Sequence, residues 1–265
     1  MKIILTGANG NLGQHILKNS DSEILSVSRG DWTSLGKIKK EEYDVLIHCA
    51  YDLKNNINSE PEAVLDSNIM TTAKVLKLCK EKGIPKLVFI SSCSVYGDLS
   101  NADEDVSCEP FTMNGFTKLF NEELIKTFCS NNNISYLIIR AFNSYGGDDK
   151  FSVVQKMIEC AKNKKQFTLV NDGDSERDFI HINDLANIVL LLNELDLENQ
   201  IVNVGSGVAI KVINILNAAE KAYGKMEFVK SYDQNEIVHS RANLKKLKQL
   251  IDHKCINLLE FIADQ

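Results

Sequence analysis

The chain has 265 residues, of which 44% are hydrophobic and 25% are charged, and its net charge is -6. These values are ordinary for one large globular domain, or for a main domain with a small second lobe. Charges of both signs are scattered along the chain, so no basic block suggests a nucleic-acid partner. No apolar run approaches the roughly 20 residues that span a bilayer. We therefore expect no nucleic-acid or membrane partner, and a cytoplasmic location.

The seven cysteines show no paired spacing of the CxxC kind, and their number is odd. This pattern favours reduced thiols over a disulfide framework or a zinc site. The sequence therefore predicts no metal centre.

Strand-like and helix-like segments alternate through the first half of the chain. Strands are predicted at Lys2–Thr6, Glu23–Ser28, Tyr43–Cys49, Lys86–Ser91 and Ile134–Arg140, and helices at Asn11–Lys18, Glu60–Lys82 and Thr117–Asn131. Repeated strand–helix units of this kind are typical of a doubly wound parallel sheet. We predict an α/β fold of the Rossmann type.

The regularity changes after about Asn143. Shorter strands at Phe167–Val170 and Ile201–Val204 mix with helices near 151–164, 183–195 and 210–222. We predict a dinucleotide-binding domain over residues 1–142, to which about 176–205 return. Residues 143–175 and 206–265 would form a small, interleaved C-terminal lobe that binds substrate.

The first strand is followed at once by a glycine-rich turn, GxxGxxG, that opens a helix. Its glycines permit a tight turn and let a pyrophosphate approach the amides at the helix N-terminus, where the helix dipole favours an anion. The context after a strand and before a helix predicts dinucleotide binding. The expected cofactor-binding residues are Gly7, Asn9, Gly10, Asn11, Leu12 and Gly13, together with Ala50 after the third predicted strand.

The end of the second strand bears on the choice of cofactor. An acidic residue there would accept hydrogen bonds from the adenosine ribose and favour NAD. This chain has Ser28 and Arg29 instead, and a guanidinium suits the 2′-phosphate of NADP. We expect NADP, with NAD as the alternative because Asp31 follows closely.

Five segments match, in order, the motifs of one known family. They are Thr6–Gly13 (TGxxGxxG), Phe89–Gly97 (FxSSxxVYG), Arg140–Gly146 (RxxNxYG), Arg177–Ala186 (RDFIHVDDLA) and Asn203–Gly207 (NVGSG). On these residues the chain resembles the extended short-chain dehydrogenases, specifically the NAD(P)-dependent sugar-nucleotide epimerase/dehydratase family.

The resemblance implies a catalytic site with one altered position. In that family a YxxxK pair works beside a serine: the lysine binds the nicotinamide ribose and the tyrosine exchanges a proton with the sugar oxygen. Here Ser92 and Lys118 match the serine and lysine, but Asn114 stands at the tyrosine position. An amide donates a hydrogen bond but is no acid near neutral pH.

Two explanations of Asn114 stay open. Another group supplies the proton, with Tyr96, Tyr145, Cys93, His181 or a bound water as the candidates. Alternatively, the chain is a catalytically silent NADP-binding sensor or scaffold on the same fold.

The resemblance also implies the substrate contacts. Asn143 and Arg177 match residues that hold the diphosphate of a nucleotide sugar, and Cys93 follows the catalytic serine. A second diphosphate-binding arginine, common in the family, is replaced by Asp233, with Arg241 nearby as a substitute. We predict a reductase of a nucleotide-linked 4-keto sugar, with 4-epimerisation as the alternative reaction and a homodimer as a possible assembly.

Overall fold

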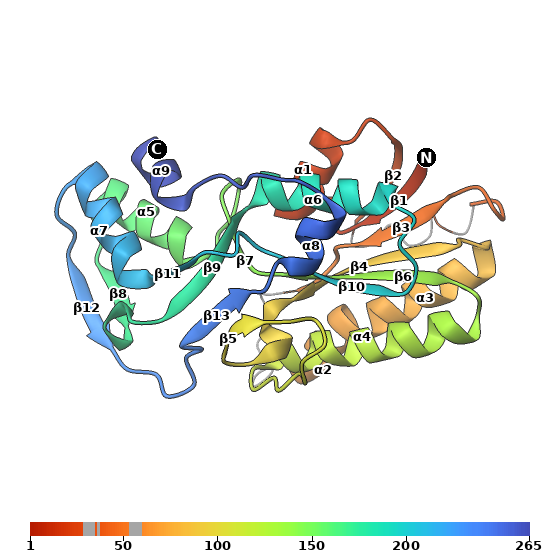
Figure 1. Ribbon diagram of the computed structural model, residues 1–265, viewed down its shortest axis with the longest axis horizontal. Coiled ribbons are helices and arrows are strands. Elements are labelled where there is room, and N and C mark those ends of the chain that lie inside the picture. The colour runs from red at the N-terminus through yellow and green to blue at the C-terminus, as the bar shows by residue number, and fades with distance from the viewer. Residues whose placement is uncertain (29–34, 36–37, 53–59) are drawn as a thin grey trace.

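A parallel sheet forms one end of the molecule in the computed structural model, which describes residues 1–28, 35, 38–52 and 60–265 (Figure 1). The described strands lie in the order β10 (Gln200–Val204), β6 (Ser135–Ala141), β4 (Lys86–Ser92), β3 (Val45–His48), β1 (Lys2–Thr6) and β2 (Glu23–Val27). Each neighbouring pair is parallel. The α/β fold of the Rossmann type is thereby confirmed.

Helices cover both faces of this sheet. On one face lie α1 (Asn11–Asn19) and α6 (Ile182–Glu194), and on the other α3 (Thr71–Lys82) and α4 (Met113–Asn131) (Figure 1). The strands are apolar on both sides because both sides are covered, as in other parallel sheets. α3 continues a shorter helix, α2 (Pro61–Leu65), through one π-helical turn at Asp66–Met70.

The rest of the chain packs against the carboxyl end of the sheet. A second sheet joins β11 (Ala209–Lys211), β9 (Glu176–His181), β13 (His239–Ala242) and β5 (Leu99–Ala102), and β7 (Asn143–Tyr145) pairs with β9. A third apolar cluster unites α5 (Val153–Asn163), α7 (Val212–Tyr223) and α9 (Leu258–Ala263) with β8 (Phe167–Val170), which pairs with β12 (Phe228–Ser231). The helix α8 (Lys245–Leu250) follows β13. The division into two domains stays a prediction.

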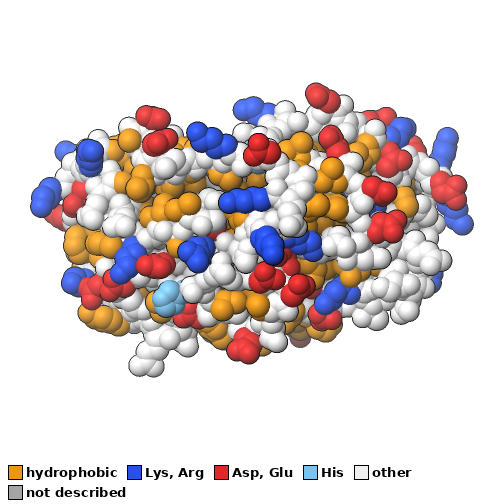
Figure 2. Space-filling view, viewed as in Figure 1, with side chains coloured by type: hydrophobic (Ala, Val, Ile, Leu, Met, Phe, Trp, Pro, Cys, Tyr) orange, Lys and Arg blue, Asp and Glu red, His pale blue; other side chains and the backbone are white. Residues whose placement is uncertain are grey.

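The surface is mixed in character. Figure 2 shows acidic and basic side chains interspersed over one face of the molecule. Among the residues that the structure describes, no helix combines the length and the apolar character needed to cross a membrane.

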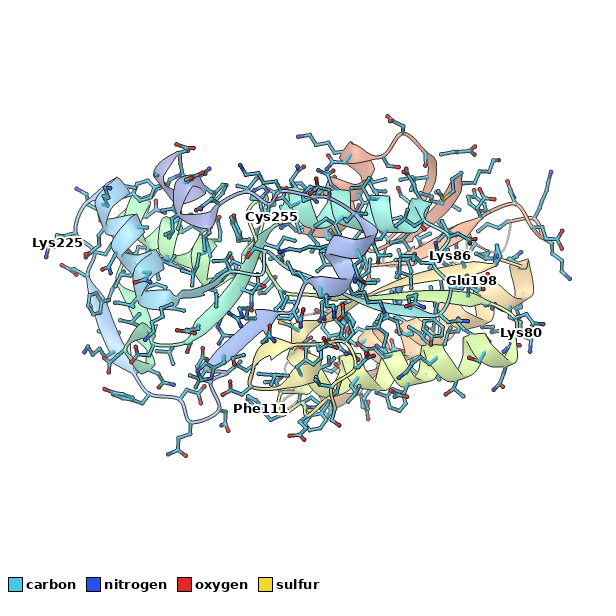
Figure 3. All side chains as sticks on the ribbon, viewed as in Figure 1. Lys80, Lys86, Phe111, Glu198, Lys225 and Cys255 are labelled. Atoms are coloured by element: carbon cyan, nitrogen blue, oxygen red, sulfur yellow. The ribbon has the colours of Figure 1, made fainter. Side chains whose placement is uncertain are left out.

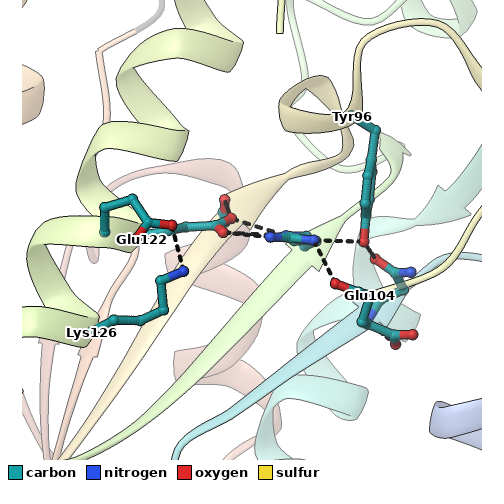
Figure 4. Close-up of polar contacts among 8 residues, drawn as sticks. Tyr96, Glu104, Glu122 and Lys126 are labelled. Carbon is teal, nitrogen blue, oxygen red and sulfur yellow. Dashed lines mark hydrogen bonds and ion pairs between the residues drawn. The ribbon is translucent and has the colours of Figure 1, made fainter. Parts of the chain in front are cut away.

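A buried ion pair joins α4 to β6 of the parallel sheet (Figure 4). Arg140 Nη2 on β6 lies 2.8 Å from Glu122 Oε2 on α4, and the two side chains are 4% and 0% exposed. Ser91 also donates a hydrogen bond to Glu122. Arg140 Nη1 donates to Tyr96 Oη at 2.9 Å, and Tyr96 in turn donates to Asn203 Oδ1 on β10 at 2.7 Å. The network therefore links three strands to the helix that carries Asn114 and Lys118.

We predict that Glu122→Ala destabilises the fold by about 3–5 kcal/mol, because it leaves the Arg140 guanidinium buried without its carboxylate partner. The double variant Glu122→Leu/Arg140→Met, which removes both charges, should recover most of that loss. Urea unfolding followed by circular dichroism measures both. A double variant as unstable as Glu122→Ala would contradict the argument from an uncompensated charge.

Candidate active site

The carboxyl ends of the parallel strands meet at one edge of the sheet, and the predicted site residues follow these ends. The glycine turn follows β1, Ala50 comes two residues after β3, and Ser92 is the last residue of β4. Ligands of open α/β sheets bind in the crevice at this edge. The topology therefore brings the cofactor turn and the catalytic motif to the same side of the molecule.

The glycine turn has the close contacts that a phosphate cradle requires. Gly7 has a φ of +74°, and a Cβ placed on it would lie 2.6 Å from the Ala50 nitrogen. A Cβ on Gly13 would lie 2.3 Å from the Gly7 oxygen. No side chain among the described residues caps the N-terminus of α1, whose N-cap is Gly10. Its first amides are therefore available to an anion.

The other predicted cofactor residues differ in what they contact. Asn9 is exposed beside the turn and Leu12 is half-buried in α1. The Asn11 side chain is engaged elsewhere, because its Nδ2 donates to Gly146 O at 2.9 Å and its Oδ1 accepts from Asp148 N at 3.0 Å. Ser28 directly follows β2, and Arg29 and Asp31 lie outside the described residues.

A chain of hydrogen bonds joins Asn114 to Ser92. Asn114 Nδ2 donates to Ser94 Oγ at 2.9 Å, and Ser94 Oγ donates to Ser92 Oγ, also at 2.9 Å. Ser92 Oγ accepts a second hydrogen bond from Ser94 N at 3.2 Å. Both lone pairs of the Ser92 hydroxyl are therefore occupied, so the hydroxyl can act further only as a donor, and the Cys93 sulfur is one neighbouring acceptor.

Asn114 retains an unused acceptor. Its Oδ1 is buried and has no hydrogen-bond partner among the described residues. A buried carbonyl without a partner costs free energy unless a ligand donates to it. The position therefore suits a hydroxyl of a bound molecule.

Lys118 lies one helical turn beyond Asn114 and is buried. Its Nζ donates to Ile90 O at 2.7 Å and lies 4.0 Å from the centroid of the Tyr51 ring and 4.9 Å from that of Phe89. Burial lowers the pKa of Lys118 to about 7, an effect only partly offset by Cys49 and Glu122. The amine is thus poised to gain and lose a proton near neutral pH.

Two residues of this cluster were missed by the sequence prediction. Ser94 lies inside the FxSSxxVYG motif, so its position between Ser92 and Asn114 had a visible signal. Tyr51 follows Ala50 directly and its hydroxyl lies 2.6 Å from Thr117 Oγ1, but no motif marked it.

The alternative proton donors have structural roles in this conformation. Tyr96 is bound within the Arg140 network, and Tyr145 Oη donates to Ile256 O at 3.2 Å. His181 Nδ1 accepts from Asn183 N and caps α6. Burial raises the pKa of the Cys93 thiol, and burial also lowers the pKa of His181. Lys118 is therefore better suited to proton transfer near neutral pH than these four groups.

The predicted substrate residues lie on the second sheet and its neighbours. Asn143 Nδ2 donates to Asp178 O at 2.8 Å, and Cys93 Sγ lies 3.6 Å from Ser240 Oγ on β13. Arg177 pairs with Glu236 and donates to Ile237 O at 3.0 Å. The carboxylate partner of Arg177 thus comes from the loop before β13, far from Arg177 in the sequence.

Arg241 as a substitute for the missing second arginine stays a prediction, and its side chain lines a cavity of about 330 Å³ together with Ser240 and Glu176. Arg241 alternates along β13 with the buried Ser240 and Ala242, and its own side chain is exposed. Because side chains of a strand alternate between faces, Arg241 points away from the face that Ser240 shares with Cys93.

Comparison with known proteins agrees with these motifs. The model of the NAD dependent epimerase/dehydratase family matches residues 3–205. A Bacillus subtilis (strain 168) protein described as an uncharacterized UDP-glucose epimerase, YtcB, is 25% identical over 292 residues, covering 96% of this chain and 92% of that protein. UDP-glucose 4-epimerase 4 of Oryza sativa subsp. japonica is 30% identical over 232 residues, covering 76% of this chain and 63% of that protein.

A solved structure supports the same conclusion. A tyrosine-to-phenylalanine variant of UDP-glucuronic acid 4-epimerase from Bacillus cereus, in complex with UDP-4-deoxy-4-fluoro-glucuronic acid and NAD, is 26% identical. The two chains superpose with a TM-score of 0.87 over 99% of this chain and 97% of that one. The family resemblance predicted from the five motifs is confirmed.

We predict that Lys118→Met stabilises the folded chain by about 1–3 kcal/mol at pH 6.5, because a buried cation is replaced by an apolar side chain. The folded pKa of Lys118 lies below its unfolded value, so the burial penalty is complete below pH 7 and fades as pH rises through the unfolded pKa. Urea unfolding at pH 6.5 and pH 9.5 measures the gap between the two proteins. A gap that does not narrow at the higher pH would contradict the assignment.

Proposed function

We propose that this chain, which belongs to the NAD dependent epimerase/dehydratase family, exchanges a hydride between C4 of a nucleotide-linked sugar and a bound nicotinamide cofactor. The observation that carries the proposal is the Ser92 hydroxyl, whose two acceptor positions are filled, so that its proton is left to be donated. Relatives named as 4-epimerases favour epimerisation over the net 4-keto reduction that the sequence suggested.

The glycine turn fits a dinucleotide. Gly7 and Gly13 leave no room for a Cβ, and the uncapped amides of α1 face the space beyond the turn. These groups would hold a pyrophosphate through backbone N–H donors and the helix dipole. The cofactor, when bound, supplies the hydride chemistry.

The Ser92 hydroxyl would orient the reacting oxygen. A hydrogen bond to that oxygen stabilises the negative charge that develops when a C4 ketone is reduced. Asn114 holds Ser94, and Ser94 holds Ser92, so the asparagine acts as a positioning residue. Its free Oδ1 would accept a hydrogen bond from a sugar hydroxyl.

Lys118 would perform the proton transfer that the family resemblance assigns to a tyrosine. Its pKa of about 7 lets the amine accept a proton during sugar oxidation and return it during reduction. Its partner Ile90 O lies two residues before Ser92 on the same strand, so the amine and the hydroxyl belong to one end of β4.

Arg177 and Asn143 would anchor the diphosphate. Arg177 is 15% exposed and already fixed by Glu236, which holds its guanidinium in place. Its remaining N–H groups would donate to phosphate oxygens, because a planar guanidinium can form two parallel hydrogen bonds with a phosphate. The pair with Glu236 reduces its net attraction for an anion, so we expect a modest affinity.

A second candidate function is a silent cofactor-binding sensor, and the observation that favours it is Asn114 at the tyrosine position. It keeps the glycine turn and its cofactor but requires no turnover. The two functions differ in whether hydride leaves the sugar at all.

We predict that the single-turnover rate of sugar oxidation rises with pH and levels off above about pH 7, because neutral Lys118 is the base. A panel of UDP-linked sugars, with bound cofactor followed by absorbance, measures it. Lys118→Met should lose at least about a hundredfold in rate, the usual contribution of an acid–base group.

Lys126→Met is the matched control, because Lys126 lies two turns further along α4 and pairs with Glu123 at the surface. It should keep the wild-type rate. Full activity in Lys118→Met would overturn the role of the lysine. Tight binding of cofactor and sugar with no hydride transfer, rescued by Asn114→Tyr, would favour the sensor instead.

The preference for NADP over NAD also stays a proposal, resting on Ser28 and Arg29. We predict that Arg29→Ala weakens NADPH binding about tenfold, the loss of roughly 1.4 kcal/mol from one phosphate contact, and leaves NADH binding unchanged. Fluorescence titration measures both, with Arg241→Ala as a control on the exposed face of β13. Equal effects on both cofactors would remove the basis for NADP.

A further inference from the structure

Three side chains of metal-binding types meet where the C-terminal segment crosses the start of α6. Asp184 lies in the first turn of α6, whereas His253 and Cys255 lie between α8 and α9. One ligand atom from each residue lies within 4.8 Å of the others. His253 Nε2 is 3.1 Å from Asp184 Oδ1, and Figure 3 shows Cys255 near the N-terminal end of α6.

Other contacts hold the Asp184 side chain and the backbone of the residue that follows Cys255. Ile256 N donates to Asp184 Oδ2 at 2.8 Å, and Tyr145 Oη donates to Ile256 O at 3.2 Å. The Asp184 side chain is 6% exposed and that of His253 is 18% exposed. Fixed partners around a ligand set orient it and lower the cost of binding an ion.

Charge and space at this place also suit a cation. The carboxylates of Asp184 and Asp178 place negative charge near the Cys255 thiol. A cavity of about 60 Å³ adjoins the cluster, lined by His253, Cys255, Gly205 and neighbouring residues. It has room for a water molecule beside the two ligands. Lys248 also lines this cavity and is the basic group nearest to it on α8.

We propose that Asp184, His253 and Cys255 form a zinc site that fastens the C-terminal segment to α6. A carboxylate, an imidazole and a thiolate are the ligand types of four-coordinate zinc, and a water in the adjoining cavity completes the set. On binding, the Cys255 thiol releases its proton to solvent, and neutral His253 binds through Nε2 and keeps its proton on Nδ1. The two ligands of the C-terminal segment are separated by one residue and lie far from Asp184 in sequence, which is why no spacing motif predicted them.

This site is separate from the proposed sugar chemistry. Zinc would bind only the folded chain, because Asp184 and the C-terminal segment meet only after folding. Zinc binding would therefore stabilise the folded state by mass action. The segment that it fastens leads into α9, which packs in the third apolar cluster.

The test is a cobalt titration of the full chain, prepared free of metal under reducing conditions. Co²⁺ bound by a thiolate gives a charge-transfer band in the near ultraviolet, and we expect it to saturate at one equivalent. Cys255→Ser should abolish the band. His253→Gln, which keeps the thiol, should weaken binding at least about tenfold.

Cys160→Ser is the matched control, because Cys160 is a half-buried free cysteine on α5, away from the cluster. It should keep the band and its stoichiometry. No band in the native chain, or an unchanged band in Cys255→Ser, would overturn the proposal. If Cys255→Ser fails to fold, His253→Gln, which keeps all seven thiols, decides whether the band belongs to this cluster, and unweakened binding in it would overturn the proposal.

Discussion

The buried pair of Arg140 and Glu122 is the constraint on which the site depends. It crosses from β6 to α4 in the middle of the molecule, where neither side chain has access to water. A charge pair of this kind is stable only when its geometry and its hydrogen bonds are complete, and Ser91 and Tyr96 complete them here. The pair therefore fixes the position of α4 along the sheet. The same network engages the Tyr96 hydroxyl, which accepts a hydrogen bond from Arg140 and donates one to Asn203, so this hydroxyl is not free for proton transfer.

The position of α4 sets the chemistry of Lys118. The helix places the Lys118 side chain against the sheet and the Tyr51 ring. There the amine donates a hydrogen bond to the carbonyl of Ile90 and is shielded from solvent. Burial of the amine lowers its pKa toward neutrality, at a cost to the stability of the fold. Asn114, one turn earlier, needs no such burial and organises Ser94 and Ser92 through neutral hydrogen bonds. In the proposed mechanism Asn114 stands at the family's tyrosine position, and Lys118 carries the proton that the tyrosine would exchange.

The sequence predicted the sheet well because parallel strands are short apolar runs between helices, and the glycine turn marked the first of them. It placed the start of α4 at Thr117, but Thr112 caps the helix and begins it at Met113. The short strands of the second sheet, such as β13, had no periodic signal, because their pairing joins segments far apart in the chain. For the same reason the sequence did not predict the ion pair of Arg177 with Glu236, which lies in the loop before β13.

The central claim is that a sugar C4 is oxidised beside Ser92 although the tyrosine is absent. It is tested most directly with a nucleotide-linked sugar that carries deuterium at C4, mixed with the chain and its oxidised cofactor. Mass spectrometry of the cofactor, quenched during the first turnover before the hydride returns to C4, shows where the label resides. The account predicts deuterium on the nicotinamide ring. Cofactor that stays unlabelled while sugar and cofactor are both shown to be bound would contradict it.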